Sequence, residues 1–442
     1  MITRRKALGG VAALAGLGLS GGCTPSRPGA GFITAADGKM WNGAAPYRFV
    51  GANLWFGAYL GAGTAYGDPA RLTRELDRLA GAGVRNLRVL GGSELSPLTN
   101  SITPAFRTES EAYNEDLLKG LDLLLAEMAA RDMRAVIYLT NFWEWSGGMM
   151  TYLYWTNGGR YINMNDPAHR WPQFPDFNAA FYQSKAAIAL YHHYVRALVG
   201  RTNSVTGRAY ADDPTVMSWQ LANEPRPGGT DAIGGANLPN FYAWINETAA
   251  LIKSLDANHL VSTGSEGVRG CIERSDCVIA SHEGPNIDYL TAHIWPQNWS
   301  WIDPLNIEGT FANAEAQTRA YITDHIALAR QLGKPLVIEE FGFPREAESF
   351  DAASPTTHRD RFYKIIYDAV EESVAQNGPL VGSNFWAWGG EGRAAHADWR
   401  FAVGDTAYMG DPPHEPQGWY SVLDGDESTL ALISAHAQAL RA

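Results

Sequence analysis

Short apolar runs alternate with segments of helical periodicity along most of the chain. The apolar runs are hydrophobic on both faces and are bounded by turn residues, as is typical of parallel strands covered by helices. Between them, apolar residues recur at spacings of three and four, for example over 114–132. The pattern predicts eight strands, at 48–54, 84–90, 134–140, 215–222, 259–265, 288–294, 335–340 and 380–388.

Eight strands separated by helices indicate one α/β domain, a closed (β/α)8 TIM barrel. An open doubly wound sheet is the competing fold, and it would place a G-x-G-x-x-G turn after the first strand. The segment 51–63 lacks that spacing, so the barrel is favoured. The connections over 146–177 and 389–426 follow the third and eighth strands and are long for this fold.

Polar and aromatic residues gather at the ends of the predicted strands. The carboxyl ends of the strands meet at one rim of a barrel, where the active sites of such folds lie. Buried carboxylates without partners are costly, so a purely structural protein would not collect them there. These residues are Arg88, Asn141, Trp143, Trp145, Asn223, Glu224, Arg226, His293, Trp295, Glu339, Glu340, Trp386 and Trp388.

Two glutamates from opposite sides of the barrel are the minimal apparatus for hydrolysing a glycosidic bond. Glu224 follows the fourth strand in the stretch LANEPRP, and Glu340 ends the seventh strand. One carboxyl must protonate the leaving oxygen while the other attacks the anomeric carbon, and a separation of about 5–5.5 Å gives retention. We expect Arg88 and His293 to orient the nucleophile, and Asn223 to hold the 2-hydroxyl of the sugar.

Two motifs carry a resemblance to a known family. WQLANEPR, followed far downstream by LVIEEFGFPR, resembles glycoside hydrolase family 5, in the clan of retaining TIM-barrel glycosidases. The resemblance covers the chain after its first residues and implies that Glu224 is the acid/base and Glu340 the nucleophile. Glu339 precedes the nucleophile by one residue, so strand alternation places it on the opposite face, in the barrel wall.

Within that family, the sequence resembles the β-mannan-degrading subgroup. Arginine after Asn-Glu-Pro and the LTNFW stretch carry this likeness, and DYLTAHIWPQNWSW adds to it. The resemblance implies that Arg226 and Trp143 line subsites for mannosyl units. It also implies that Asn141 and Trp386 contact the substrate.

The sequence departs from the family pattern at one position. The family has His-x-Tyr after the sixth strand, and this chain has His293 followed by Ile294 and Trp295. The tyrosine hydroxyl that contacts the nucleophile in the family is therefore missing. The indole N–H of Trp295 is the candidate replacement.

The function predicted first is a secreted retaining endo-1,4-β-mannanase acting on mannan and mannooligosaccharides. An exo-acting β-mannosidase is the close alternative, because the 389–426 loop could block one side of the cleft. The insertion over 146–177 could do the same or extend the subsites. A β-1,4-glucanase and a non-catalytic carbohydrate-binding barrel are further alternatives. A binder has no need for both glutamates, which argues against the last one.

The composition of the chain narrows the classes of ligand that the protein is expected to bind. The formal charge is −12, and it becomes −15 without residues 1–22, which carry three positive and no negative charges. An acidic protein repels nucleic acid, so a neutral ligand is expected. The chain has 15 tryptophans, a surplus that fits stacking on sugar rings. Zinc-type Cys/His spacing is not visible, so no metal or cofactor is expected, and we expect a monomer.

The N-terminus has the features of an export signal. Residues 1–22 contain a twin-arginine-like start and a short apolar stretch, and Cys23 is a candidate site for lipid attachment. Residues 23–31 then form a linker and 32–442 the catalytic domain. We expect a periplasmic, extracellular or lipid-anchored protein. In such an oxidising compartment, Cys271 and Cys277 are close enough in sequence to form a disulfide, although the spacing alone leaves this open.

Overall fold

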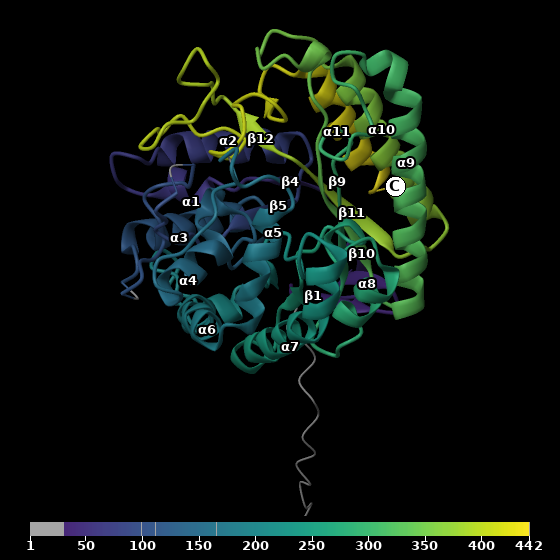
Figure 1. The fold of residues 1–442 in the computed structure, drawn as a ribbon. Helices are drawn as coiled ribbons and strands as arrows, with labels where there is room; N and C mark the ends of the chain where they lie inside the picture. Colours follow the sequence, from purple (N-terminus) through teal and green to yellow (C-terminus); the bar gives the residue numbers. More distant parts are fainter. Residues whose placement is uncertain (1–30, 99, 111, 165, 442) are drawn as a thin grey trace, which may run out of the picture.

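The computed structural model describes residues 31–98, 100–110, 112–164 and 166–441, and its centre is an eight-stranded parallel barrel (Figure 1). All eight predicted strands are present, so the barrel is confirmed and the open doubly wound sheet is wrong. The strands are β4 (Phe49–Asn53), β5 (Asn86–Leu90), β6 (Arg134–Tyr138), β7 (Val216–Gln220), β8 (Leu260–Ser262), β9 (Leu290–Ile294), β10 (Leu336–Phe341) and β11 (Leu380–Phe385).

Helices surround these strands, as Figure 1 shows looking onto the barrel. Each helix buries its apolar side against the strands and its neighbours, which explains the alternating sequence pattern. The helices are α1 (Gly57–Gly61), α2 (Pro69–Gly81), α3 (Glu115–Ala129), α4 (Gly148–Thr156), α5 (Gln173–Asn178), α6 (Lys185–Val199), α7 (Asp231–Leu255), α8 (Ser275–His282), α9 (Ile307–Leu332), α10 (Thr357–Ala375) and α11 (Glu427–Ala439). Short 3-10 turns are η1 (Glu144–Ser146), η2 (Ala179–Gln183), η3 (Tyr210–Asp212), η4 (Arg269–Cys271) and η5 (Glu346–Glu348).

Neighbouring strands of the barrel are hydrogen-bonded in the order β8-β7-β6-β5-β4-β11-β10-β9. The ring is completed between β8 and β9 by two backbone hydrogen bonds. The N–H of Asp288 donates to the carbonyl of Val261 at 2.8 Å, and that of His293 donates to Glu266 at 3.1 Å. The second of these bonds lies at the carboxyl end of the strands and fixes His293 relative to Glu266.

A small antiparallel sheet covers the amino end of the barrel. Its strands are β1 (Ile33–Ala36), β2 (Lys39–Asn42) and β3 (Ala45–Pro46), which the periodicity did not predict. Ile33 and Met40 pack against apolar residues at or near the starts of the barrel strands. This sheet therefore lies opposite the rim at which the carboxyl ends of the strands meet. The residues it contacts are Phe49, Val136, Met217, Leu260, Tyr289, Val337 and Val381.

The two long connections are ordered and lie over the carboxyl end. The 146–177 segment contains α4 and α5, whereas 389–426 is largely irregular. Its start and end pair as β12 (Trp388–Gly390) and β13 (Val422–Leu423). Inside it, the fully buried carboxylate of Asp411 accepts hydrogen bonds from the N–H groups of Gly418 at 2.8 Å and Tyr420 at 2.7 Å. A loop braced in this way can hold side chains in a defined position.

The predicted export signal, Cys23 and the first eight residues of the 23–31 linker lie outside the described residues. Within the described part of the chain, none of the helices combines the length and apolar character needed to span a bilayer.

Candidate active site

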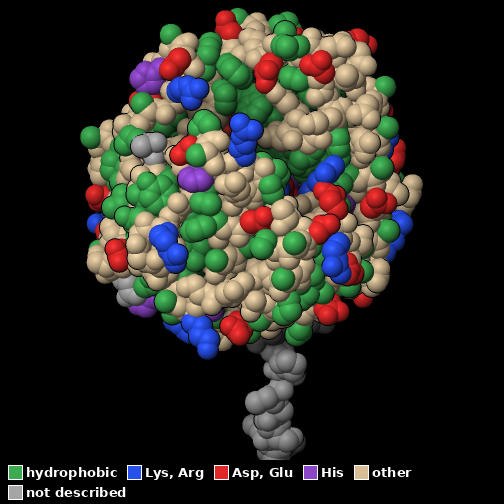
Figure 2. Space-filling view, viewed as in Figure 1, with side chains coloured by type: hydrophobic (Ala, Val, Ile, Leu, Met, Phe, Trp, Pro, Cys, Tyr) green, Lys and Arg blue, Asp and Glu red, His purple; other side chains and the backbone are tan. Residues whose placement is uncertain are grey.

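A cavity of about 610 Å³ opens at the carboxyl end of the barrel. Figure 2, drawn in the view of Figure 1, shows a hollowed face with hydrophobic and charged side chains around it. Residues from the loops after most of the strands line this cavity. Among them are Trp143, Trp145, Trp171, Asn223, Glu224, Arg226, Glu266, Trp295, Asn298, Trp299, Glu340, Trp386, His414 and Glu415.

The ten strand-end residues that the sequence analysis assigns to catalysis or to the substrate come together here, in two layers. Seven of them line the cavity, namely Trp143, Asn223, Glu224, Arg226, Trp295, Glu340 and Trp386. The other three, Arg88, Asn141 and His293, are not among the lining residues and are fully buried. The prediction that Asn141 contacts the substrate is therefore corrected, whereas Arg88 and His293 lie beside Glu340, where they can orient it. All three lie deeper in the barrel, where they contact and orient residues of the cavity lining.

Arg88 is the centre of the buried layer. Its Nε donates to Gln220 at 2.8 Å, and its terminal nitrogens donate to Asn53 at 3.2 Å and to Asn223 at 2.7 Å. A terminal nitrogen also donates to Glu340 Oε1. The planar guanidinium thus orients the nucleophile candidate and an amide of the cavity wall at the same time.

Asn141 supports the same amide from the other side. Asn223 Nδ2 donates to Asn141 Oδ1 at 3.0 Å, and the backbone N–H of Trp143 donates to the same oxygen at 3.0 Å. Asn141 therefore couples the end of β6 to the residue that precedes Glu224. Asn141 therefore lies behind the cavity wall, where it holds the side chain of Asn223.

Glu339 does not turn to the opposite face as simple alternation predicted. The register between β10 and β9 shifts between Ile338 and Glu340, which is the signature of a β-bulge. Glu339 consequently points into the barrel, where it accepts a hydrogen bond from Gln220 Nε2 at 2.5 Å and lies 3.5 Å from Arg88 Nε. It remains buried and outside the cavity lining, so Glu340 alone of the pair reaches the cleft.

Glu224 sits in a strained backbone conformation, with φ of +50°. This left-handed region is uncommon for residues other than glycine and is held here by a hydrogen bond from its own N–H to Gly264 O at 2.9 Å. The strained backbone turns the side chain inward. Trp143 Nε1 donates to Oε2 at 2.5 Å, and His293 Nδ1 is hydrogen-bonded to Oε1 at 2.6 Å.

Burial raises the pKa of both Glu224 and Glu340. It raises the pKa of Glu224, against the lowering effects of Arg226 and of the Trp143 N–H. Burial also raises the pKa of Glu340 well above its ordinary value, against the lowering effect of Arg88. The pKa of His293 is held well below its ordinary value by burial and by Arg88, so its ring is neutral at pH 7. Its Nδ1 lies 3.3 Å from Glu340 Oε2 and thus between the two carboxylates.

Trp295 does not replace the missing tyrosine in the way the sequence suggested. Its indole N–H donates to Glu224 Oε1 at 3.3 Å and makes no hydrogen bond to Glu340 among the described contacts. The indole packs against Trp386 and Tyr420, with ring centroids 5.9 and 5.1 Å away. That packing directs the N–H to the other carboxylate.

Arg226 and Glu266 form a second charged pair in the cavity wall. The guanidinium donates two hydrogen bonds to the carboxylate, both at 2.6 Å, and lies 5.1 Å from the ring centroid of Trp143 and 5.5 Å from that of Trp171. The side chains of Arg226 and Glu266 are only 12% and 1% exposed. A largely desolvated bidentate pair of this kind is rigid and fixes the shape of the wall.

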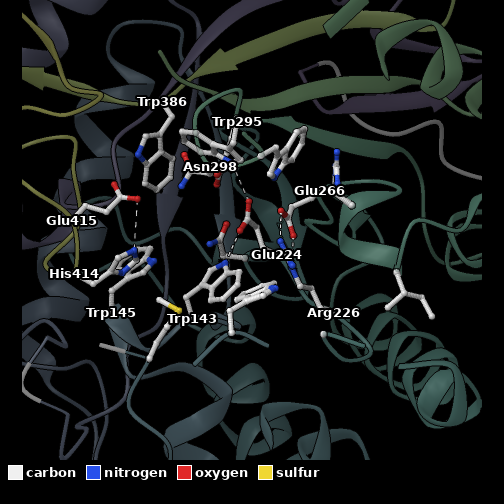
Figure 3. Close-up of a pocket in the computed structure, with 18 of the residues that line it drawn as sticks. Trp143, Trp145, Glu224, Arg226, Glu266, Trp295, Asn298, Trp386, His414 and Glu415 are labelled. Atoms are coloured by element: carbon white, nitrogen blue, oxygen red, sulfur yellow. Dashed lines mark hydrogen bonds and ion pairs between the residues drawn. The ribbon is translucent and has the colours of Figure 1, made fainter. Parts of the chain in front are cut away.

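His414 and Glu415 close the other end of the cavity. Figure 3 shows them beside Trp145, on the opposite side of Glu224 from Arg226 and Glu266. Both residues come from the 389–426 loop, and the ring of His414 lies 6.4 Å from that of Trp145. The cavity thus has one end bounded by a braced loop and one end bounded by the charged pair.

Sequence reasoning missed several of these residues. Glu266 follows the fifth strand, and the strand-end rule that found Glu224 would have found it too. His414, Glu415 and Trp171 lie on long insertions, where length was the only signal. Their approach to the cavity depends on tertiary packing.

A barrel with paired glutamates at its carboxyl end, flanked by tryptophans, defines the class of TIM-barrel glycosidases. A sequence profile described as glycoside hydrolase family 5 β-mannosidase-like matches residues 30–442. The chain belongs to this family.

Relatives in the family are similar over most of their length. A glycoside hydrolase family 5 mannosidase from Rhizomucor miehei superposes with a TM-score of 0.84, is 32% identical, and is covered over 98% of its chain and 93% of this one. A mutant of that mannosidase is known in complex with mannosyl-fructose. Mannan endo-1,4-β-mannosidase 1 from Arabidopsis thaliana is 29% identical over 351 residues, 76% of each chain. This chain is accordingly a glycoside hydrolase related to mannanases and mannosidases.

The Arg226–Glu266 pair predicts a specific loss of stability. Glu266→Ala leaves a largely buried guanidinium unpaired and is expected to lower the free energy of unfolding by about 3 kcal/mol. The matched control is Glu273→Ala, which removes the exposed carboxylate from Arg269 and is expected to cost less than about 1 kcal/mol. Urea denaturation of both variants measures the difference. Equal losses would contradict a structural role for the buried pair.

Proposed function

We propose that the protein is a retaining β-mannosidase that releases mannose from the non-reducing end of β-1,4-linked mannooligosaccharides. The observation that carries this proposal is the 389–426 loop, which brings His414 and Glu415 against one end of the cavity (Figure 3). A chain running through the cleft would collide with this loop. A terminal sugar would fit between the loop and the two glutamates.

The spacing of the carboxylates supports retention. One oxygen of Glu224, one of Glu340 and a nitrogen of His293 all lie within 4.8 Å of one another. Retaining glycosidases hold their carboxyl groups about 5–5.5 Å apart, whereas inverting enzymes need about 6.5–9.5 Å to admit a water. The cavity therefore suits direct attack by one glutamate.

Glu340 is assigned as the nucleophile, because Arg88 stabilises its ionised form. In the first step, a Glu340 oxygen bonds to the anomeric carbon as the glycosidic bond breaks, and Glu224 transfers its proton to the departing oxygen. In the second step, Glu224 takes a proton from water. That water displaces Glu340 from the anomeric carbon and releases mannose.

The neighbours of Glu224 suit both steps. Burial raises the pKa of Glu224 and so favours the protonated form that the first step needs, and the contacts with Trp143 and Trp295 stabilise the carboxylate that the step produces. Asn223 faces the cavity between Arg88 and Asn141 and is the candidate partner for the 2-hydroxyl. Trp386, on the side of the closing loop, is the candidate platform for the sugar ring.

An endo-acting mannanase is the second candidate. The names of the plant relatives favour it, because the Arabidopsis protein described above is a mannan endo-1,4-β-mannosidase. The two candidates share the glutamates and differ only at the end of the cleft that the 389–426 loop occupies.

We also propose that the protein acts outside the cytoplasm. The signal-like residues 1–22 support this, and so does the Cys271–Cys277 disulfide, since such bonds persist in oxidising compartments.

Product analysis tests the proposed end of attack. Mannohexaose reduced at its reducing end should give mannose and the reduced pentamer as first products, because the terminal sugar alone fits beside the loop. Chromatography of early time points, with mannan as a parallel substrate, measures this. A mixture of internal fragments from the start would reject the exo action and favour the endo candidate.

Replacement of the nucleophile tests the residue assignment. Glu340→Ala should lower kcat by at least about 10⁴-fold, because the covalent intermediate can no longer form. Binding should persist, since Trp143, Trp386 and Asn223 remain, and tryptophan fluorescence on titration with mannotriose measures it. Turnover at the wild-type rate would refute the assignment.

The hydrogen bond from the indole N–H of Trp143 to Glu224 should affect how kcat/KM depends on pH. It hydrogen-bonds the charged form of Glu224 and so lowers its pKa, and Trp143→Phe should raise that pKa. The protonated acid then persists to higher pH, and the basic limb of the kcat/KM profile shifts upward. The control Trp299→Phe alters another cavity tryptophan that does not hydrogen-bond Glu224 and should leave the limb in place. A downward shift in the Trp143 variant would contradict this account.

A further inference from the structure

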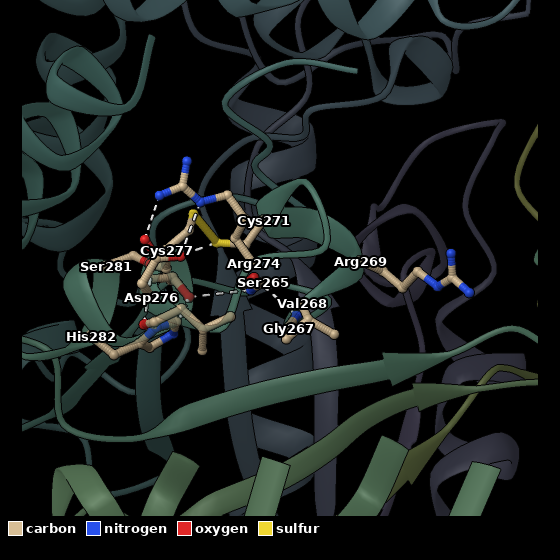
Figure 4. The surroundings of a disulfide bond; sticks show 12 residues. Ser265, Gly267, Val268, Arg269, Cys271, Arg274, Asp276, Cys277, Ser281 and His282 are labelled. Carbon is tan, nitrogen blue, oxygen red and sulfur yellow. Dashed lines mark hydrogen bonds and ion pairs between the residues drawn. A yellow bond between two sulfur atoms is a disulfide. The ribbon is translucent and has the colours of Figure 1, made fainter. Parts of the chain in front are cut away.

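Figure 4 shows a short loop closed by a disulfide. Ile272 and Glu273 of this loop line the cavity, as do Arg226 and Glu266. Cys271 ends η4 and Cys277 lies in the first turn of α8, with Cα atoms 5.6 Å apart. The structure thus forms the disulfide that sequence spacing left open. The cysteines are 1% and 0% exposed, so the bond forms the buried base of the loop.

The residues after Cys271 have unusual backbone conformations. Ile272 has φ of +47° and ψ of +44°, and Glu273 has φ of +57°. Two successive left-handed residues are rare, and a β-branched residue in this region is a clear outlier. Such strain persists where the surrounding structure enforces it, and it marks functional segments. Both residues line the cavity.

Contacts on both sides hold this conformation. Gly234 of α7 packs so closely that a Cβ there would lie 2.8 Å from Ile272 Cγ2. Glu273 N–H donates to Val268 O at 2.9 Å, and Arg274 N–H to Cys271 O at 3.0 Å. The disulfide adds a covalent limit on how far the loop can relax.

The loop also positions Arg269, which lines the cavity as well. Glu273 accepts a hydrogen bond from Arg269 at 2.7 Å, and the guanidinium lies 5.1 Å from the ring centroid of Trp299. Gly270 lies against Glu266, because a Cβ there would be 3.4 Å from Glu266 Oε2. The loop therefore continues the cavity wall directly beyond the Arg226–Glu266 pair.

We propose that Arg269, Ile272 and Glu273 form a leaving-group wall, which the disulfide holds in shape and which binds the second sugar on the departing side of the scissile bond. This inference rests on the proposed function, because the 389–426 loop then takes the terminal mannose and the rest of the chain extends toward Arg226. The apolar side chain of Ile272 meets the C–H face of a sugar ring. Arg269 and Glu273 hydrogen-bond its hydroxyls.

Substrate length tests this wall. Mannobiose places one sugar on the departing side, and mannotriose places two. Ile272→Gly keeps the left-handed backbone at no steric cost and removes the side chain. It should lower kcat/KM for mannotriose about fivefold, mainly through KM, while kcat/KM for mannobiose and for p-nitrophenyl β-mannoside changes by less than about twofold.

The matched control is Asn377→Gly. Asn377 is also left-handed, with φ of +55°, but it precedes β11 at the amino end of the barrel, away from the cavity. This variant should leave the activity on all three substrates unchanged. An Ile272→Gly variant that loses equal activity on all three substrates, or on none, overturns the leaving-group wall.

The double variant Cys271→Ser, Cys277→Ser tests the role of the disulfide. It should reproduce the selective loss on mannotriose, because the loop can then relax from its left-handed conformation. An unchanged ratio of kcat/KM for mannotriose and mannobiose overturns that role. The wild-type products from reduced mannohexaose report the proposed function separately: internal cleavage rejects exo action, whereas exo action with an unchanged length ratio in Ile272→Gly rejects only the wall.

Discussion

The active site depends on one buried arginine. Arg88 lies in the middle of β5, contacts Glu340 and Asn223, and approaches Glu339 to 3.5 Å. A buried guanidinium and two buried carboxylates are each costly to desolvate alone, and they are tolerated because they are paired and hydrogen-bonded. Arg88 therefore opposes the rise that burial causes in the pKa of Glu340, and the fixed fork of the guanidinium sets the direction in which Glu340 faces.

The remaining charges follow from this arrangement. With the Arg88 charge directed at Glu340, Glu224 is buried beside neutral His293 and two indole N–H groups. Burial raises the pKa of both glutamates, and their different partners, a guanidinium for Glu340 and indole N–H groups for Glu224, suit them to different roles. The two ends of the cleft differ equally clearly. A braced loop closes one end, while an ion pair and a disulfide-closed loop shape the other. The two ends of the cavity therefore present different residues to a bound chain.

Much of this could be predicted from the sequence. Hydrophobic runs found all eight barrel strands, and the strand-end rule brought ten residues to one site, because a parallel barrel places all carboxyl ends at one rim. The failures have local causes. A bulge in β10 turned Glu339 inward, and the packing of Trp295 on Tyr420 sent its N–H to Glu224. Glu266 was missed although its strand end was visible.

The sequence by itself predicted the barrel from its periodicity, the family from two motifs, and the glutamate pair from the residue types at strand ends. Only the tertiary structure decided which residues line the cavity and which lie behind it. It also decided where the 389–426 loop and the disulfide-closed loop lie relative to Glu224. The physical reason is that both loops are held by long-range contacts, such as Asp411 with Tyr420 and Gly234 with Ile272, and such contacts leave no periodic signal in the sequence.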